Sequence, residues 1–372
     1  MDILHKGFDG LDVSFCAALP LELVDKLEAA KAHAVATETP AILPIADLIL
    51  SVAQTGARGG YRYQCDTGPL GAVWFFKVPK AGDPWGVRVS CRALPLALRG
   101  LEQVRADLYA TMNTLGIRYA PSGESIARVD YAIDILAPDF SPDPHCFVMH
   151  SRTGQTTHEE LDSRTSNGRS GRITSITIGK TPNRQVILYD KRQEVMDKGK
   201  VHWPEIWNAN RAKAGKSPLD MADASSSRVW RIEFRAMKKC LKDRWDITLW
   251  SHLQNRLAEC MADMCERVRY TVPTTDTNRA RWPDAPIWSL IRCELAGGLA
   301  EVASGVPEPL ILELHDQHRR RMLIRQMLGV GISAAHLDSI TVDNFEEWLD
   351  GCNAELKALS RSEKVGLADR LR

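Results

Sequence analysis

The sequence predicts an α+β fold: two related antiparallel-sheet modules of the order β-α-β-β-β-α, followed by an all-α C-terminal domain. Before residue 245, short segments of alternating apolar and polar residues recur between Gly, Pro, Asn and Asp, which is typical of antiparallel strands. After residue 245 the apolar residues recur at helical spacing instead. We therefore expect a sheet domain over residues 1–245, with modules at about 7–120 and 121–245, and a helical domain over 246–372.

The first module begins with the strand pattern LDVSF at 11–15, and a helical pattern with Pro20 near its start follows at 19–35. Three further strand patterns and a closing helix are expected at 61–66, 72–78, 86–93 and 96–116.

The second module repeats this order, with a strand at 127–136, a helix starting within 142–151, and strands at 173–179, 185–190 and 229–237. The link between its last two strands, residues 196–227, is long and polar, and links of that length are either functional or mobile. Trp203 and Trp207 in this link could stack on unpaired bases or anchor the link to the fold.

The composition excludes several classes of protein. The 372 residues are 44% hydrophobic and 26% charged, as in a soluble globular protein. No apolar leader stands at the N-terminus, and the run AILPIADLILSVA is too short to span a bilayer. Nine cysteines without a Cys-x-x-Cys pair indicate neither a disulfide framework nor a zinc knuckle. We expect a cytoplasmic protein without a membrane partner.

Positive charge is concentrated in one stretch, although the formal net charge of the chain is only +1. Residues 164–200 contain nine Lys or Arg and three acids. Such a local basic field suits phosphate binding, but a solvated loop face would have the same composition.

Strand parity brings ionisable residues together in the second module, because alternate side chains of a strand share a face. The residues that fall on such faces are Arg128, Asp130 and Asp134 in one strand, Tyr189 and Lys191 in the next, and Arg231, Glu233 and Arg235 in the last. If these faces coincide, Asp130 and Glu233 form a pair of hard oxygen ligands suited to Mg²⁺ or Mn²⁺, with Asp134 as a competitor of Asp130. Taken singly, each residue has an ordinary structural explanation, such as an exposed cross-strand ladder.

Tyr189 is the candidate nucleophile. A free phenol has a pKa near 10, so only about 0.1% is phenolate at neutral pH, and a nucleophilic Tyr needs a neighbouring cation, metal or base. Lys191 and a metal held by the two acids could supply this need. His145 and His150 do not form a His-hydrophobe-His pair, which leaves a carboxylate-rich metal site.

The segments ARVDYAIDI, TIGKTPNRQVILYDKRQE and VWRIEFR, together with the opening GFDGLDVSF, resemble the replication-initiation-factor family over residues 7–245. The family contains rolling-circle initiators of plasmids and filamentous phages, and related conjugative relaxases. The resemblance implies that Tyr189 attacks a DNA phosphodiester and forms a 5′-phosphotyrosine, with Lys191 assisting and with Asp130 and Glu233 as metal ligands. The basic residues that would hold DNA phosphates are Lys180, Arg184, Arg192, Arg231, Arg235 and Arg128.

Two alternatives stay open: a non-enzymatic DNA-binding protein, and a conjugative relaxase with the same chemistry. The expected partner is origin DNA, either single-stranded or extruded as a hairpin, and a host helicase and a second copy of the chain are further candidates. The segment at 319–337 resembles a helix-turn-helix in outline, but helical packing or dimerisation explains it equally well.

Overall fold

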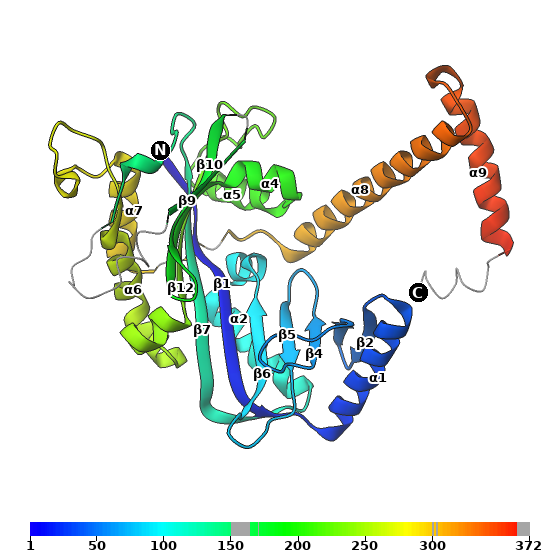
Figure 1. The fold of residues 1–372 in the computed structure, drawn as a ribbon, viewed down its shortest axis with the longest axis horizontal. Helices are drawn as coiled ribbons and strands as arrows, with labels where there is room; N and C mark the ends of the chain where they lie inside the picture. The colour runs from blue at the N-terminus through cyan, green and yellow to red at the C-terminus, as the bar shows by residue number, and fades with distance from the viewer. Residues whose placement is uncertain (150–163, 170, 300, 303, 363–372) are drawn as a thin grey trace. The chain divides into compact units, whose positions relative to one another are not determined.

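A computed structural model describes residues 1–149, 164–169, 171–299, 301–302 and 304–362. It divides the chain into two compact units, Met1–Glu308 and Pro309–Arg372. The predicted boundary at 245/246 is therefore displaced, because the first helices after residue 245 pack on the sheet of the first unit instead of forming a separate domain (Figure 1).

An antiparallel sheet of eleven strands forms the body of the first unit, in the order β2-β3-β4-β5-β6-β1-β7-β12-β11-β10-β9. The long strands β1 (Asp2–Ala18) and β7 (Arg118–Leu136) lie side by side at its centre. One half is completed by β2 (Ala41–Ile45), β3 (Leu48–Val52), β4 (Tyr63–Asp66), β5 (Ala72–Phe76) and β6 (Trp85–Cys91). The other half contains β9 (Arg164–Arg169), β10 (Arg172–Lys180), β11 (Arg184–Asp190) and β12 (Val229–Met237).

Along the chain, each half of the sheet begins with its central strand, β1 or β7, and ends with the strand that lies next to it in the sheet. Thus β6 flanks β1 and β12 flanks β7. This order is compatible with two modules placed side by side; that the modules are related stays a prediction. The β2–β3 hairpin is an addition to the predicted order. Its Pro44 looks like a break in the sequence, but Pro is tolerated on an edge strand, and β2 is at the edge.

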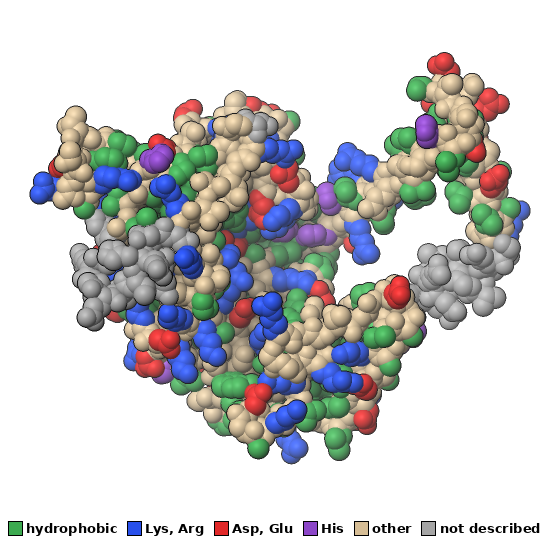
Figure 2. Space-filling view, viewed as in Figure 1, with side chains coloured by type: hydrophobic (Ala, Val, Ile, Leu, Met, Phe, Trp, Pro, Cys, Tyr) green, Lys and Arg blue, Asp and Glu red, His purple; other side chains and the backbone are tan. Residues whose placement is uncertain are grey.

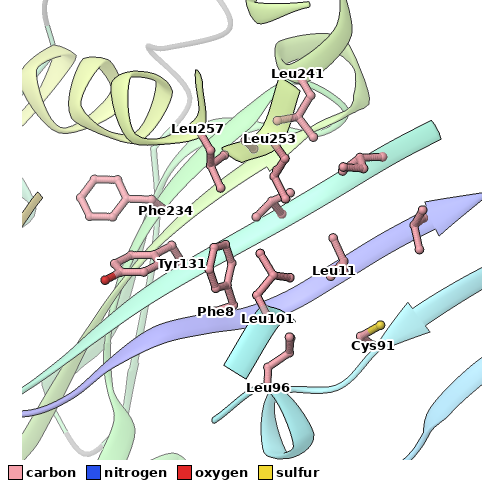
Figure 3. Close-up of a cluster of buried hydrophobic side chains, with 14 of the residues drawn as sticks. Phe8, Leu11, Cys91, Leu96, Leu101, Tyr131, Phe234, Leu241, Leu253 and Leu257 are labelled. Atoms are coloured by element: carbon pink, nitrogen blue, oxygen red, sulfur yellow. The ribbon is translucent and has the colours of Figure 1, made fainter. Parts of the chain in front are cut away.

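One face of the sheet is covered by helices and carries the main core. α1 (Leu21–Thr37) and α2 (Ala93–Thr114) cover one half, and α6 (Trp250–Arg267) packs on β7 and β12. Figure 3 shows Leu253 and Leu257 of α6 above Phe234 and Tyr131 of the sheet. Burial of these apolar surfaces is the main source of stability of the unit.

The opposite face of the second half is covered only in part, by α4 (Lys191–Lys198) and α5 (His202–Lys213). Helix α5 lies within the link predicted to be a polar loop, and its Trp203 and Trp207 are buried, so these rings anchor the link instead of stacking on bases. The helix predicted to start within 142–151 is also wrong in its described part, which contains the 3-10 turn Pro144–Cys146 and the strand β8 (Phe147–Met149); its last two residues lie outside the described residues.

The remainder of the first unit contains a π-helical turn (Lys239–Arg244), β13 (Val268–Tyr270) paired with β8, a 3-10 turn (Arg279–Arg281) and α7 (Pro286–Ala296). The described part of the second unit contains α8 (Glu308–Leu337), whose first residue still belongs to the first unit, a 3-10 turn (Val342–Asn344) and α9 (Phe345–Ser362). Because α8 is one continuous helix, residues 319–337 do not form a helix-turn-helix. Among the described residues, no helix is long and apolar enough to cross a membrane.

Candidate active site

The register of three neighbouring strands places the predicted residues on the partly open face. In β12, Arg231 pairs with Tyr189 of β11 on one side and with Asp134 of β7 on the other. Arg235 pairs in the same way with Asp130 of β7. Since these pairs are directly opposite each other, their side chains share a face. The convergence expected from strand parity is therefore present in the sheet.

Tyr189 and Lys191 lie together. The Nζ atom of Lys191 is 3.4 Å from the Tyr189 hydroxyl oxygen and 5.5 Å from the centre of its ring. The sequence places Lys191 on the strand, whereas in the structure β11 ends at Asp190, and Lys191 is the first residue of α4. The Asp190 side chain caps this helix by accepting a hydrogen bond from the Gln193 backbone, which fixes the turn that brings Lys191 back to Tyr189.

Lys191 is only 1% exposed, and its charge is held by an acid. Its Nζ donates to Glu194 Oε2 at 2.6 Å, and Lys200 donates to the other oxygen of the same carboxylate at 2.6 Å. The Trp203 ring centre lies 4.8 Å from the ammonium. Burial lowers the pKa of Lys191 to about 8, with the nearby Arg231 charge contributing in the same direction.

The phenol of Tyr189 is half-buried, and burial raises its pKa well above 10. Arg231 opposes this shift in pKa, while the carboxylates of Asp9, Glu233 and Glu194 add to it. Phenolate is therefore scarce in the resting protein, and nucleophilic use of this oxygen requires a cation or a proton acceptor at the moment of reaction.

Asp130 and Glu233 form a second cluster, held by two arginines. Arg128 Nε donates to Asp130 Oδ2 at 2.9 Å. Arg235 bridges the two acids, with its Nη2 2.6 Å from Glu233 Oε1 and its Nε 3.3 Å from Asp130 Oδ2. Burial raises the pKa of Asp130 to about 7, and the Glu233 charge adds to this effect while Arg128 opposes it. The two carboxylates are thus close enough to repel each other.

Asp134 does not belong to this cluster. Its carboxylate is fully buried and accepts hydrogen bonds from Arg231 Nη2 at 2.7 Å and from Trp207 Nε1 at 2.8 Å. Arg231 is 0% exposed and also pairs with Asp9. Both residues are therefore structural: Asp134 has no oxygen to offer a metal without breaking a buried ion pair, and Arg231 cannot reach a DNA phosphate.

Three other predicted phosphate contacts lie away from Tyr189. Lys180 and Arg184 pair with each other across β10 and β11 at positions whose side chains point to the opposite face. Arg184 is buried and contacts Asp263 of α6 at 3.2 Å, so it is a structural residue. Arg192 is half-buried and donates to Ser227 Oγ at 2.9 Å and to the Met221 carbonyl at 2.6 Å, so it fastens the segment before β12. Lys180 is exposed.

Reasoning from the sequence missed three residues at this site. Asp9 lies at a bulge of β1, where the pairing with β7 shifts between Phe8 and Gly10, and there it pairs with Arg231. His5 packs edge-on against Trp203. Glu194 holds Lys191. Only Glu194 left a usable signal, because a Glu three residues after a Lys in a helix can pair with it.

A cavity of about 480 Å³ opens beside these groups. Its lining includes Asp9, Tyr189, Glu194, Lys200, Glu233 and Arg235. Glu194 of the first cluster and Glu233 and Arg235 of the second thus border the same space, and α4 forms one of its walls. The side chains of Lys191 and Asp130 lie behind this lining and are not part of it.

The acidic side chains at the site show how well it would fit a divalent ion. Among the described residues, no group of three or more His, Cys, Asp and Glu side chains is arranged to hold a metal ion. Asp130 and Glu233 are hard oxygen donors of the kind that Mg²⁺ and Mn²⁺ bind, and with only these two acids water would complete most of the coordination shell. Burial is the main cause of the raised pKa of Asp130 and the Glu233 charge adds to it, so a cation between the two acids would offset the second effect. Arg128 and Arg235 now occupy the oxygens concerned.

No family model matches the sequence, and no curated protein matches it. Among solved structures, the chain is similar to a rolling circle replication initiator protein from Geobacillus stearothermophilus, with 14% sequence identity and a TM-score of 0.39. The match covers 80% of this chain and 98% of the other. At this score the likeness carries no argument about this chain.

Proposed function

We propose that this protein is a DNA-nicking and strand-transfer enzyme that initiates rolling-circle replication. The observation that carries the proposal is the Tyr189 hydroxyl 3.4 Å from the buried Lys191 ammonium, beside a cavity that Glu233 and Arg235 also line. A phenol with an ammonium beside it, next to a cavity bordered by an acid and an arginine, supplies parts that phosphodiester transfer to Tyr requires.

In this reaction the Tyr189 oxygen forms a bond to the phosphorus of a DNA phosphodiester, and the bond from phosphorus to the 3′-oxygen breaks. The 5′-phosphate at the break is then linked to Tyr189. The phenol loses one proton and the departing 3′-oxygen takes one up to become the primer hydroxyl, so the step moves one proton from Tyr189 to the 3′-oxygen by way of water. The phosphotyrosine bond conserves the energy for rejoining, so no nucleotide is consumed.

Lys191 stabilises the phenolate as the proton leaves Tyr189, because its ammonium is within reach of the oxygen and largely shielded from water. Glu194 keeps that ammonium in place. Arg235 and Arg128, which are partly exposed, are the residues of the predicted set best placed to contact the scissile strand. A divalent ion held by Asp130 and Glu233 would supply further charge neutralisation at the phosphate.

The test is to incubate supercoiled origin DNA and Mn²⁺ with the wild-type protein and with Tyr189→Phe. We expect the wild type to nick, and the variant to bind DNA with unchanged affinity without nicking. The ring of Tyr189 contacts Lys191 through its face as well as its hydroxyl, so Phe preserves the packing.

A non-enzymatic DNA-binding protein is the second candidate. It is favoured by the arginine partners of Asp130 and Glu233 and by the raised pKa of Tyr189. Wild-type protein that binds origin DNA but never nicks it under any divalent ion would establish this alternative. A conjugative relaxase would give the same result as the initiator in this assay.

A further inference from the structure

The second unit exposes an unusual amount of apolar surface. More than half of the exposed large hydrophobic side chains of the described residues lie between Leu310 and Leu359. Met327 is 66% exposed and Val330 is 70% exposed, and no side chain of α9 is buried over residues 345–361, where its exposure is described. Contiguous apolar surface of this kind marks a site of protein interaction.

Both helices carry this surface as a stripe with alternating spacings of four and three residues. In α9 the stripe contains Phe345, Leu349, Cys352 and Leu356. In α8 the residues with this spacing are Leu323, Met327, Val330, Ala334 and Leu337, and further exposed apolar side chains, Met322, Ile324, Leu328 and Ile332, lie beside them on the same helix. That spacing is the seam on which helices pack in coiled coils and bundles. Each stripe therefore fits another helix as its partner.

Within one chain the two stripes meet only near the turn. A Cβ atom at Gly331 would lie 3.8 Å from Leu349, and Trp348 Nε1 donates to Asp338 Oδ2 at 2.8 Å. From there α8 and α9 diverge (Figure 1). Away from the turn, the apolar stripe of each helix is not covered by the other helix of the same chain.

The charges of the two helices are complementary but out of register within one chain. Arg319, Arg320, Arg321 and Arg325 make one stretch of α8 basic, and Glu346, Glu347, Asp350 and Glu355 make the start of α9 acidic (Figure 2). Contact of Leu349 with Gly331 places the acidic start of α9 beside the end of α8. The arginines lie 6 to 12 residues earlier, or about 9–18 Å along the helix at 1.5 Å per residue.

We propose that this arm, residues 309–362, pairs with the arm of a second copy of the chain, with α8 of each copy against α9 of the other. A second chain is free to shift along the seam until basic and acidic stretches meet, which the hairpin cannot do in cis. The interaction is also self-complementary: each copy offers one basic and one acidic stretch, as a two-fold symmetric dimer requires.

The test is sedimentation equilibrium of the full-length protein over a range of concentrations. We expect wild type to be a dimer. Two charge-reversed variants, Arg319→Glu/Arg320→Glu/Arg321→Glu and Glu346→Lys/Glu347→Lys/Asp350→Lys, should each be monomeric. The variant that combines all six substitutions should regain the dimer, which also shows that neither triple variant fails to fold. A matched control, Arg58→Glu/Lys80→Glu/Arg118→Glu, reverses three exposed charges of the first unit and should stay dimeric.

Three outcomes would overturn the proposal. A monomeric wild type would mean that the hairpin closes on itself or binds another molecule. A dimer that survives both reversals would place the interface elsewhere. Loss of DNA binding by the arginine variant without a change in mass would make the arginines a DNA contact. Because the readout is mass, the result does not depend on whether the protein nicks DNA.

Discussion

Lys191 is the residue on which the proposed chemistry depends most after Tyr189. Its ammonium is shielded from water, has Glu194 as its acid partner, and reaches the phenol oxygen. Burial holds its pKa at about 8, so it is charged at neutral pH and loses its proton only slightly above it. A cation that stabilises a phenolate is useful only while it is charged.

The rate of nicking should therefore fall as the pH rises through about 8. Glu194→Gln removes the carboxylate that raises the pKa of Lys191, so the fall should begin at lower pH in this variant. The measurement is the single-turnover nicking rate across pH for both proteins, with Lys198→Gln as a control that removes a more distant Glu194 contact. A rate that rises through the same pH range would show instead that neutral Lys191 acts as a base.

Strand parity predicted which side chains share a face, and it did so for Asp130, Tyr189 and Glu233 because the periodicity of a strand depends only on its backbone. Strand parity could not show that Asp130 and Asp134 have different roles. That difference arises from α5, whose Trp207 covers Asp134 and not Asp130. It also missed Asp9, because a bulge leaves no mark in an alternating pattern.

At the scale of elements, the approach of β1 to β7 positions Asp130. Gly10 is opposite Asp130 in the register, and a Cβ atom at Gly10 would lie 2.9 Å from Asp130 Oδ2. That separation is too short for an ordinary contact, and the buried carboxylate has little room to move away. Gly10, the second glycine of GFDG, is thus required because a side chain there would collide with Asp130, and not because its own backbone angles demand glycine.

Gly10→Ala should displace the Asp130 carboxylate and reduce nicking at least tenfold, equivalent to about 1.4 kcal/mol of transition-state stabilisation. The far-ultraviolet circular dichroism should be unchanged. Gly329→Ala is the control for loss of a glycine, since no atom lies within 4 Å of a Cβ there and the residue is helical. Equal activity of Gly10→Ala and wild type would remove Asp130 from the site.

Most helices and strands could be predicted because their apolar periods are long and regular, as in α6 and β12. α5 could not, because its four buried residues, His202, Trp203, Ile206 and Trp207, are set among polar residues. Its two tryptophans contact the buried ion pair of Arg231 and Asp134, which the sequence does not reveal. The predicted domain boundary was displaced for a related reason. The spacing of apolar residues identifies a helix, but it does not show that α6 packs on the sheet.

At the scale of the whole molecule, most of the basic charge near the site is neutralised internally. Arg231 and Arg184 are buried with acids, and Arg128 and Arg235 pair with Asp130 and Glu233. A basic stretch in the sequence thus does not translate into an equally basic surface. Counterion release on DNA binding scales with the phosphates that are actually neutralised.

Binding of a single-stranded origin oligonucleotide should therefore depend only weakly on salt. If Arg128 and Arg235 alone contact phosphates, the slope of log K against log salt concentration should be about −1.4, at about −0.7 per contact. Fluorescence anisotropy over a salt series measures it. A slope near −4, as expected from about six contacts, would show that the ion pairs open when DNA binds.

The most direct test of the central claim is capture of the covalent intermediate. An oligonucleotide of the origin strand is incubated with the full-length protein and Mn²⁺, the mixture is denatured and digested, and the adduct is located by mass spectrometry. The account predicts a nucleotide linked by its 5′-phosphate to the peptide that contains Tyr189, and no adduct with Tyr189→Phe. A nicked product whose protein carries no nucleotide, or an adduct on another tyrosine, would contradict it.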